Sequence, residues 1–319
     1  MNTIIIDGLS FALPLFAMAI GGIYSERSGV TNLAIEGLQG VGAFFGALFV
    51  VLVAGNQGTN SQAIFYLSFL FAMLGGMVYA LLHALLCVKF KANQVISGVV
   101  INILAMALTA FLTKQVNKSV FNAPSDKFQL GVSVRFTVPV LSDIPVLGAV
   151  FTNIYPFEII IIVVAFIAWF MLYRSRFGLH LRACGDNPHA VDAAGRNVGQ
   201  IRTVAIMVSG ALSGLGGMCF AYSISAKFSE SIYVGYGYLA IAALIFGNWK
   251  ILPTLGACLL FGFARSAGYQ IVQVLEKPSS YSDLVMILPY LLTLLLLMFF
   301  SKYNRAPKAL GEIYDKGKR

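Results

Sequence analysis

Long runs of apolar residues constrain this chain more than any other feature of its sequence. Nine such runs occur, at about residues 4–22, 34–54, 63–88, 95–113, 155–173, 201–225, 234–248, 252–275 and 283–301. Because a helix needs about 20 mostly apolar residues to cross the hydrocarbon core of a bilayer, most of these runs are long enough to span it. We therefore predict an all-α polytopic membrane protein, with residues 1–319 forming one transmembrane domain of about nine hydrophobic segments.

The composition excludes several other classes of protein. Charged residues make up 11% of the chain and hydrophobic residues 58%, whereas an ordinary soluble domain is about 25% charged. A soluble enzyme, a disordered chain and a nucleic-acid binder are thereby excluded, despite a formal net charge of +9. The cysteines have no CxxC spacing, which indicates buried thiols rather than a disulfide scaffold. They are Cys87, Cys184, Cys219 and Cys258.

The first apolar run has some features of a signal peptide. Ala17-Met18-Ala19 resembles a cleavage site, but no basic residue precedes it and Asp7 stands where positive charge is expected. Since a signal peptide begins with a basic region, we expect this run to be a retained span.

Lysine and arginine residues predict the orientation. If all nine runs cross, fifteen of the 22 fall on one side of the membrane and six on the other, with Arg265 inside a span. The positive-inside rule then places the N-terminus outside and the C-terminal tail, 302–319, in the cytoplasm. The run at 234–248 is short for a crossing and also suits a broken or re-entrant helix. The charge rule favours a crossing, because the basic tail would otherwise be exported.

Two connections between the runs are long and hydrophilic. Residues 114–154 are expected to form an external loop, in which 132–138 alternates well enough for a short strand. Residues 174–200 are expected to form the one sizeable cytoplasmic loop. A chain that is mostly buried helix has few surfaces for a soluble partner, so this second loop is the candidate contact surface.

Polar residues near the second run form the first candidate site. Asn32, Glu36 and Gln39 are spaced i, i+4, i+7 and would share one face of a helix. One interpretation is a loop and a helix cap, with Asn32 as the capping residue. The other is a polar stripe that lines a translocation path, because polar groups in hydrocarbon usually face a path or a bundle interior.

Two further clusters have the same ambiguity. Gln94, Ser97 and Asn102 can lie on one face of the fourth span, as path lining or as hydrogen-bonding links between helices. Tyr236 and Tyr238 alternate with glycines at the start of the seventh run, which suits an interrupted helix on a substrate path or an interfacial tyrosine belt. Arg265, inside the eighth run, is a functional candidate without a readable partner, or else forms a structural ion pair or hydrogen bond.

Enzyme motifs are missing from the sequence. The three histidines are scattered, and HExxH, GxSxG and GxxxxGK[ST] patterns do not occur. We expect no catalytic residues, no metal site and no cofactor bound by this chain. If ATP powers transport, the ATPase must be another polypeptide.

The loop at 174–200 carries the first family resemblance. Its sequence Arg182-Ala183-Cys184-Gly185-Asp186-Asn187-Pro188, followed by Ala190, Ala193, Ala194 and Gly195, resembles the ATPase-coupling loop of ABC-importer permeases of the ribose and branched-chain amino-acid permease superfamily. Arg196 replaces the usual aliphatic residue. Pro188 suits the first turn of a short helix, and Asp186 and Asn187 are good helix caps. The resemblance implies that Arg182, Gly185, Asp186, Asn187, Pro188, Ala190, Ala193 and Gly195 take part in coupling.

Within that superfamily the chain resembles the nucleoside branch. Ser25-Glu26-Arg27-Ser28-Gly29-Val30-Thr31-Asn32-Leu33-Ala34-Ile35-Glu36-Gly37 is similar to its pattern, with Ala34 where glycine is usual, and Asn93-Gln94-Val95-Ile96-Ser97-Gly98 with Asn102 is similar as well. The resemblance implies a multi-pass nucleoside permease subunit in a bacterial-type cytoplasmic membrane.

Partners follow from the same resemblance. It implies a second related permease, in a heterodimer, a cytoplasmic ATPase subunit that binds ATP and Mg, and an external substrate-binding lipoprotein. Membrane lipid surrounds the chain, and no nucleic acid is expected. The alternatives are an ABC permease for simple sugars such as ribose, which neighbouring genes would identify, and an ion-coupled secondary transporter, for which Glu36 is the one plausible intramembrane carboxylate.

Overall fold

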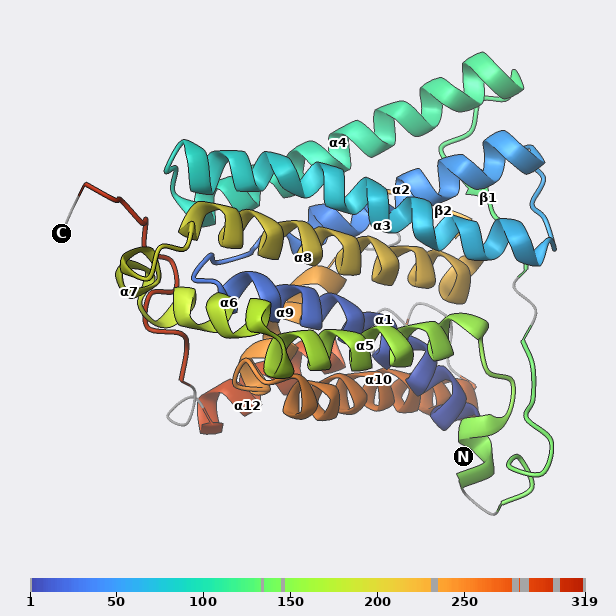
Figure 1. The fold of residues 1–319 in the computed structure, drawn as a ribbon. Helices are drawn as coiled ribbons and strands as arrows, with labels where there is room; N and C mark the ends of the chain where they lie inside the picture. The colour runs from blue at the N-terminus through green and yellow to red at the C-terminus, as the bar shows by residue number, and fades with distance from the viewer. Residues whose placement is uncertain are drawn as a thin grey trace.

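The computed structural model describes residues 2–132, 135–144, 147–230, 235–276, 281, 287–300 and 305–317. These ranges are mostly helical, and the first and last described residues lie at opposite ends of the bundle (Figure 1). The helices are α1 (Asn2–Arg27), α2 (Ile35–Ala54), α3 (Gln62–Ala84), α4 (Gln94–Phe121), α5 (Pro156–Arg174), α6 (Arg176–Asp186), α7 (Pro188–Ala193), α8 (Val198–Phe220), α9 (Tyr236–Phe246), α10 (Ile251–Val274) and α12 (Leu288–Phe300).

Seven of these helices are long and apolar enough to cross a membrane: α1, α2, α3, α4, α5, α8 and α10. A π-helical turn extends α3 through Leu85–Lys89, and another extends α8 through Ala221–Ser225. The two remaining apolar runs correspond to α9, with 11 residues, and α12, with 13. The predicted all-α polytopic fold is confirmed, and α9 is the short element at 234–248.

Small residues let three helices pack very closely. A Cβ atom built on Gly210 of α8 would collide with the carbonyl oxygen of Gly76 in α3, and one on Gly214 would collide with that of Ala72. Gly42 of α2 packs in the same way against the Cα atom of Gly214. The backbones of α2, α3 and α8 therefore touch directly, as small residues four apart predict for membrane helices.

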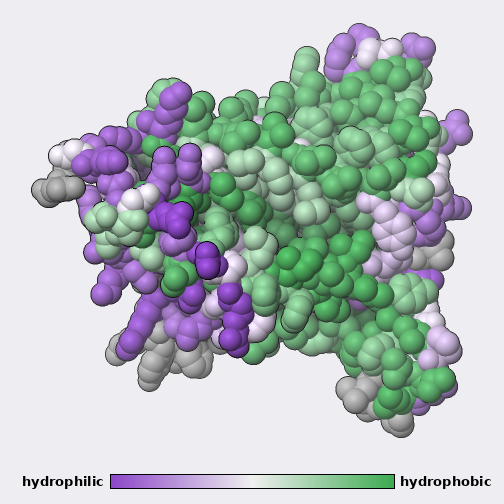
Figure 2. Space-filling model, viewed as in Figure 1, coloured by the Kyte–Doolittle hydropathy of each residue, from purple (hydrophilic) through white to green (hydrophobic). Residues whose placement is uncertain are grey.

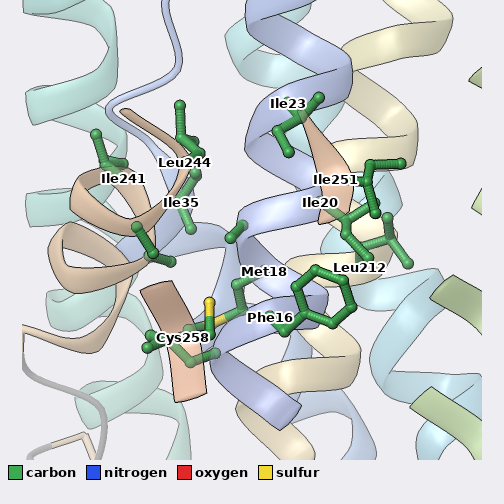
Figure 3. Close-up of a cluster of buried hydrophobic side chains, with 14 of the residues drawn as sticks. Phe16, Met18, Ile20, Ile23, Ile35, Leu212, Ile241, Leu244, Ile251 and Cys258 are labelled. Atoms are coloured by element: carbon green, nitrogen blue, oxygen red, sulfur yellow. The ribbon is translucent and has the colours of Figure 1, made fainter. Parts of the chain in front are cut away.

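A buried apolar cluster joins α9 to the centre of the bundle. Ile241 and Leu244 of α9 lie beside Ile35 of α2 and near the central helix α1, which contributes Ile20 and Ile23 (Figure 3). Aliphatic side chains around much of α9 are buried, so this helix is held inside the protein rather than at the lipid surface.

The N-terminal end of the bundle carries a small sheet. Strand β1 (Phe128–Gln129) pairs antiparallel with β2 (Lys227–Phe228), and Phe136 forms an isolated bridge with Ile154. Helix α4 continues to Phe121, so the first residues of the connection predicted at 114–154 are helical. Residues 133, 134, 145 and 146 of that connection, including part of the predicted strand, lie outside the described residues.

The C-terminal end carries α6, α7 and the tail, residues 305–317. Figure 2 shows a broad hydrophobic band over the long helices, with hydrophilic residues gathered where α6 and α7 lie. This distribution is the one expected of a bundle whose sides face lipid and whose ends face water.

Candidate functional site

The polar segment before α2 is not part of that helix. Helix α2 begins at Ile35, so Asn32 belongs to a non-helical connection and does not share a helical face with Glu36 and Gln39, as the spacing predicted. The side-chain amide of Asn32 donates to Oγ of Ser209 at 2.8 Å, and its oxygen accepts the N–H of Ala34 at 3.1 Å. Both bonds are buried, so Asn32 fixes this connection against α8.

The start of α2 lies inside the bundle rather than at its surface. Helix α8 begins at the end of the bundle that carries α6 and α7. Ser209 lies eleven residues further along α8, which is about 16 Å of helix. Glu26, 3% exposed, holds the connection from the other side: it accepts Nε1–H of Trp249 at 2.5 Å and the N–H of Asn32 at 3.5 Å. The sequence analysis overlooked Glu26, although it belongs to the same motif.

Glu36 joins the beginnings of two helices. Its carboxylate accepts the backbone N–H of Gly235, and that of Gly237 at 2.6 Å. These N–H groups belong to the first turn of α9, where backbone donors lack helical partners and the helix dipole is positive. Gly235 adopts a left-handed conformation (φ 92°) that glycine tolerates well, and this brings the backbone close to the carboxylate. A single side chain of α2 thus caps α9.

Asn102 of α4 completes this junction. Its oxygen accepts the N–H of Gly37 at 2.8 Å, and its amide donates to the carbonyl oxygen of Leu33 at 2.8 Å and to Oη of Tyr238 at 3.0 Å. We call Glu36, Asn102 and Tyr238 the polar junction. It links α2, α4 and α9 at the level where the connection before α2 ends.

The other predicted path residues lie apart from this junction. Gln94 accepts the N–H of Thr31 at 2.7 Å and donates to the carbonyl oxygen of Glu312 at 3.5 Å. Ser97 bonds Nδ1 of His83 at 2.8 Å. Gln39 is fully buried against Gly217 of α8. The role of these residues in a path stays a prediction.

Tyr236, at the start of α9, contacts Arg265 of α10. Its hydroxyl lies 3.5 Å from the Nη2 atom of Arg265, which can donate to it. The guanidinium carbon lies 4.4 Å from the ring centroid of Phe11 and 5.0 Å from that of Tyr269. Aromatic faces within about 6 Å stabilise a cation, and among the described residues Arg265 forms no ion pair. Its described partners inside the bundle are therefore aromatic residues, through two rings and the hydroxyl of Tyr236.

A polar cavity of about 360 Å³ opens beside Arg265 at the N-terminal end. Its lining is Asp7, Ser10, Phe11, Ser223, Ile224, Arg265, Ser266 and Tyr269. Nε of Arg265 and Oγ of Ser266 are buried without a hydrogen-bond partner. Sequence reasoning found only Arg265, because the other polar residues are single hydroxyls or lie at the ends of apolar runs.

The predicted coupling loop folds into two helices. Asn187 caps α7 by accepting the N–H of Ala190 at 3.1 Å, and Pro188 occupies the first turn, as expected. Asp186 differs from the expectation, because it is the last residue of α6 rather than a cap. Ala190 and Ala193 are exposed on α7, whereas Pro188 is buried toward the bundle. The exposed alanines form a small apolar surface.

The rest of the loop is fixed to the bundle. A Cβ atom on Gly185 would collide with the carbonyl oxygen of Arg27, so α6 packs directly on the end of α1. Burial raises the pKa of the Cys184 thiol above its ordinary value, which keeps the thiol protonated at neutral pH. Arg182 lies over the ring of Tyr173, with 5.6 Å from its guanidinium carbon to the ring centroid. Gly195 ends this region with a left-handed backbone (φ 76°).

The tail connects this loop to the connection before α2. The N–H of Ala309 donates to the carbonyl oxygen of Gly185 at 2.8 Å, and the N–H of Gly311 donates to that of Gly29 at 3.1 Å. Arg202 of α8 donates to the carbonyl oxygen of Glu312 at 3.0 Å.

Two ion pairs hold the end of the tail, Lys91–Asp315 at 2.8 Å and Lys316–Asp192 at 3.3 Å. The second joins the tail to α7. Among the described residues, no group of three His, Cys, Asp or Glu side chains could hold a metal ion.

Comparison with known proteins gives relatives along the whole chain. The chain is 40% identical to the guanosine ABC transporter permease protein NupQ of Bacillus subtilis, covering 100% of this chain and 98% of the relative. It is 38% identical to the nucleoside ABC transporter permease protein NupC of Lactococcus lactis, with the same coverage. The guanosine ABC transporter permease protein NupP of Bacillus subtilis is 25% identical over 95% of this chain and 82% of its own.

No solved structure is a significant match to the chain. Residues 4–297 match the family described as branched-chain amino acid transport system / permease component. The chain belongs to this permease family.

Proposed function

We propose that this chain is the permease subunit through which an ABC importer takes up nucleosides. The observation that carries the proposal is the full-length similarity to two permeases named for guanosine and for nucleosides. The cavity beside Arg265 supports it, because a guanidinium, three serine hydroxyls and a tyrosine ring offer donors and a stacking face. A nucleoside carries both a flat base and several hydroxyls.

We place the path between this cavity and the polar junction. The N-terminal end faces outside and the C-terminal end faces the cytoplasm, in agreement with the excess of Lys and Arg at the latter. A nucleoside would enter beside Arg265, pass Tyr236, and reach Glu36 and Asn102 where α9 begins. Helices interrupted near the middle of the membrane often form substrate sites in transporters.

The energy for transport comes from ATP hydrolysis by a partner subunit. ATP and Mg bind to a separate ATPase subunit, which contacts the exposed alanines of α7. A second, related permease completes the channel, and the similarity to NupP shows that more than one permease of this kind occurs in an organism with NupQ. An external lipoprotein delivers the nucleoside.

Uptake by the reconstituted importer tests the substrate. The chain is coexpressed with a candidate second permease, ATPase and binding protein from the same genome, and labelled guanosine, uridine and ribose are compared. We expect ATP-dependent uptake of the nucleosides. Uptake of ribose but not of the nucleosides would show that the substrate is a simple sugar. Uptake by this chain alone under an ion gradient would overturn the importer assignment.

Coupling through α7 needs its own test. Ala193→Asp places a charge on the exposed apolar surface of α7, so we expect substrate-stimulated ATP hydrolysis to be lost. Ala123→Asp, at an exposed position at the opposite end, is the matched control and should leave it intact. Full stimulation of ATP hydrolysis by substrate in Ala193→Asp would show that α7 does not form the contact with the ATPase.

A further inference from the structure

An apolar groove runs along the side of the bundle between α1, α5 and α10. Its volume is about 410 Å³, and its walls include Phe16 of α1, Phe166 and Trp169 of α5, and Leu252 and Leu255 of α10. Figure 2 shows the hydrophobic band in which α5 and α10 lie. In a membrane this groove is open to lipid tails.

A second cavity, of about 440 Å³, continues the groove toward the C-terminal end. Trp169 and Leu252 line both cavities, so the two are adjacent. The second differs in its charge, because three of its lining residues are the cations Arg27, Arg182 and Lys250. They come from α1, α6 and the residue before α10, and the fold alone brings them together.

Few acidic groups compensate the positive charge of these three residues. The ion pairs of the described residues involve Lys91 and Lys316 and none of the three. Asp186 lies near enough to Arg27 to offset part of the charge. Arg27 donates to the carbonyl oxygen of Trp249 at 3.0 Å and Arg182 to that of Gly178 at 3.3 Å. Since each of these bonds uses only Nε, the other guanidinium nitrogens can still bind an anion.

The length of the groove matches one leaflet of a bilayer. From Ile162, at the inner end of the groove, to Tyr173, beside the cations, α5 advances eleven residues. At 1.5 Å per residue this is about 16 Å, and half of a hydrocarbon core of about 30 Å is about 15 Å. An acyl chain with its head group at the cations would therefore end near Ile162.

We propose that this groove binds one anionic phospholipid of the cytoplasmic leaflet. The acyl chain lies between α1, α5 and α10, and the phosphate lies among Arg27, Arg182 and Lys250. The proposal rests on the orientation given above, because anionic head groups are attracted to basic residues at the cytoplasmic face. A second permease is the other candidate occupant, but it would have to bring an acidic group to the three cations.

The position of Arg182 gives such a lipid a role. Arg182 belongs to α6, which leads directly to α7, so a phosphate bound there ties the base of the coupling loop to the ends of α1 and α10. The lipid would thereby keep α6 in place while α7 is moved by a partner.

Native mass spectrometry of the purified importer complex tests the site. The complex is incubated with equal amounts of phosphatidylglycerol and phosphatidylcholine of the same acyl chains. We expect one phosphatidylglycerol to be retained in preference. Lys250→Gln should weaken this retention about fivefold, the effect of one basic residue on an anionic lipid. Leu252→Trp should reduce retention of both lipids by filling the groove.

Lys89→Gln is the matched control, since Lys89 is an exposed cation at the same end but away from the groove. Equal retention of the two lipids, or an equal loss in Lys89→Gln, would overturn the proposal. So would a crosslink from Leu252→Cys to the second permease, because it would show that a protein fills the groove. These readouts measure binding, so they stand apart from whether the complex imports nucleosides.

Discussion

At the scale of single residues, Glu36 connects the beginnings of two helices. It lies in the first turn of α2 and accepts two backbone N–H groups from the first turn of α9. Each helix start carries unpaired donors and a positive dipole end. One carboxylate therefore accepts unpaired donors of α9 and lies at the positive end of the α2 dipole, which explains why an acid is placed where hydrocarbon would otherwise exclude it.

Replacing Glu36 by glutamine tests this account. A glutamine offers one acceptor oxygen in place of two, so one buried N–H of Gly235 or Gly237 would lose its partner. The expected loss is about 1–3 kcal/mol of unfolding free energy, seen as a lower thermal unfolding midpoint of the purified complex. Glu276→Gln, at an exposed site, should leave the midpoint unchanged. If both variants unfolded at the wild-type temperature, Glu36 would not be holding α9.

The polar residues near the second and fourth runs could be found from the sequence, but their arrangement could not. Gln39 and Ser97 are buried, as polar groups within apolar runs predict, and so are Asn32 and Gln94 just before the runs. Their hydrogen bonds depend on contacts between segments far apart in the chain, such as Asn32 with Ser209. No periodicity within one segment can reveal such a partner.

At the scale of elements, the seven long helices follow directly from hydropathy, and the interruptions do not. The apolar run that we placed at 34–54 begins one residue before α2, yet nothing in the run shows that this helix starts inside the bundle. Helix α9, at about 16 Å for 11 residues, is half as long as a crossing needs. The glycines around Tyr236 and Tyr238 were the usable signal for that break.

Close packing of α3 and α8 predicts a sharp difference between two glycines. Gly210→Val should disrupt assembly, because even a Cβ atom at this position collides with the backbone of Gly76. Gly256→Ala in α10 meets no atom within 4 Å, and alanine favours helix by about 1 kcal/mol over glycine. We expect size-exclusion chromatography to show loss of folded protein only for Gly210→Val. Normal yield of that variant would contradict the packing.

At the scale of the whole molecule, the tail is the element that joins distant parts. Residues 305–317 contact the end of α6, the turn after α1, the start of α4, α7 and α8. The basic composition of the tail predicted its side of the membrane and gave no sign of these contacts. They are made mainly by backbone groups, which sequence patterns do not distinguish.

Removing the tail should therefore weaken coupling. A chain that ends at residue 304 loses the bonds to Gly185 and Gly29, and we expect ATP hydrolysis that responds less to substrate, measured in the reconstituted complex. The double variant Lys91→Gln, Lys316→Gln removes only the two ion pairs, which are partly exposed and contribute about 0–1 kcal/mol each. It should behave like the wild type. If it matched the truncation, the charges rather than the backbone bonds would hold the tail.

The shared carboxylate of Glu36 also limits the ways in which the bundle can rearrange. Helices α2 and α9 cannot slide past each other without breaking two hydrogen bonds at once, one buried and one partly buried. Separate helices could move relative to each other, but these bonds prevent such movement between α2 and α9. An alternation of access that keeps these bonds must therefore turn the pair as one rigid body, with α4 following through Asn102.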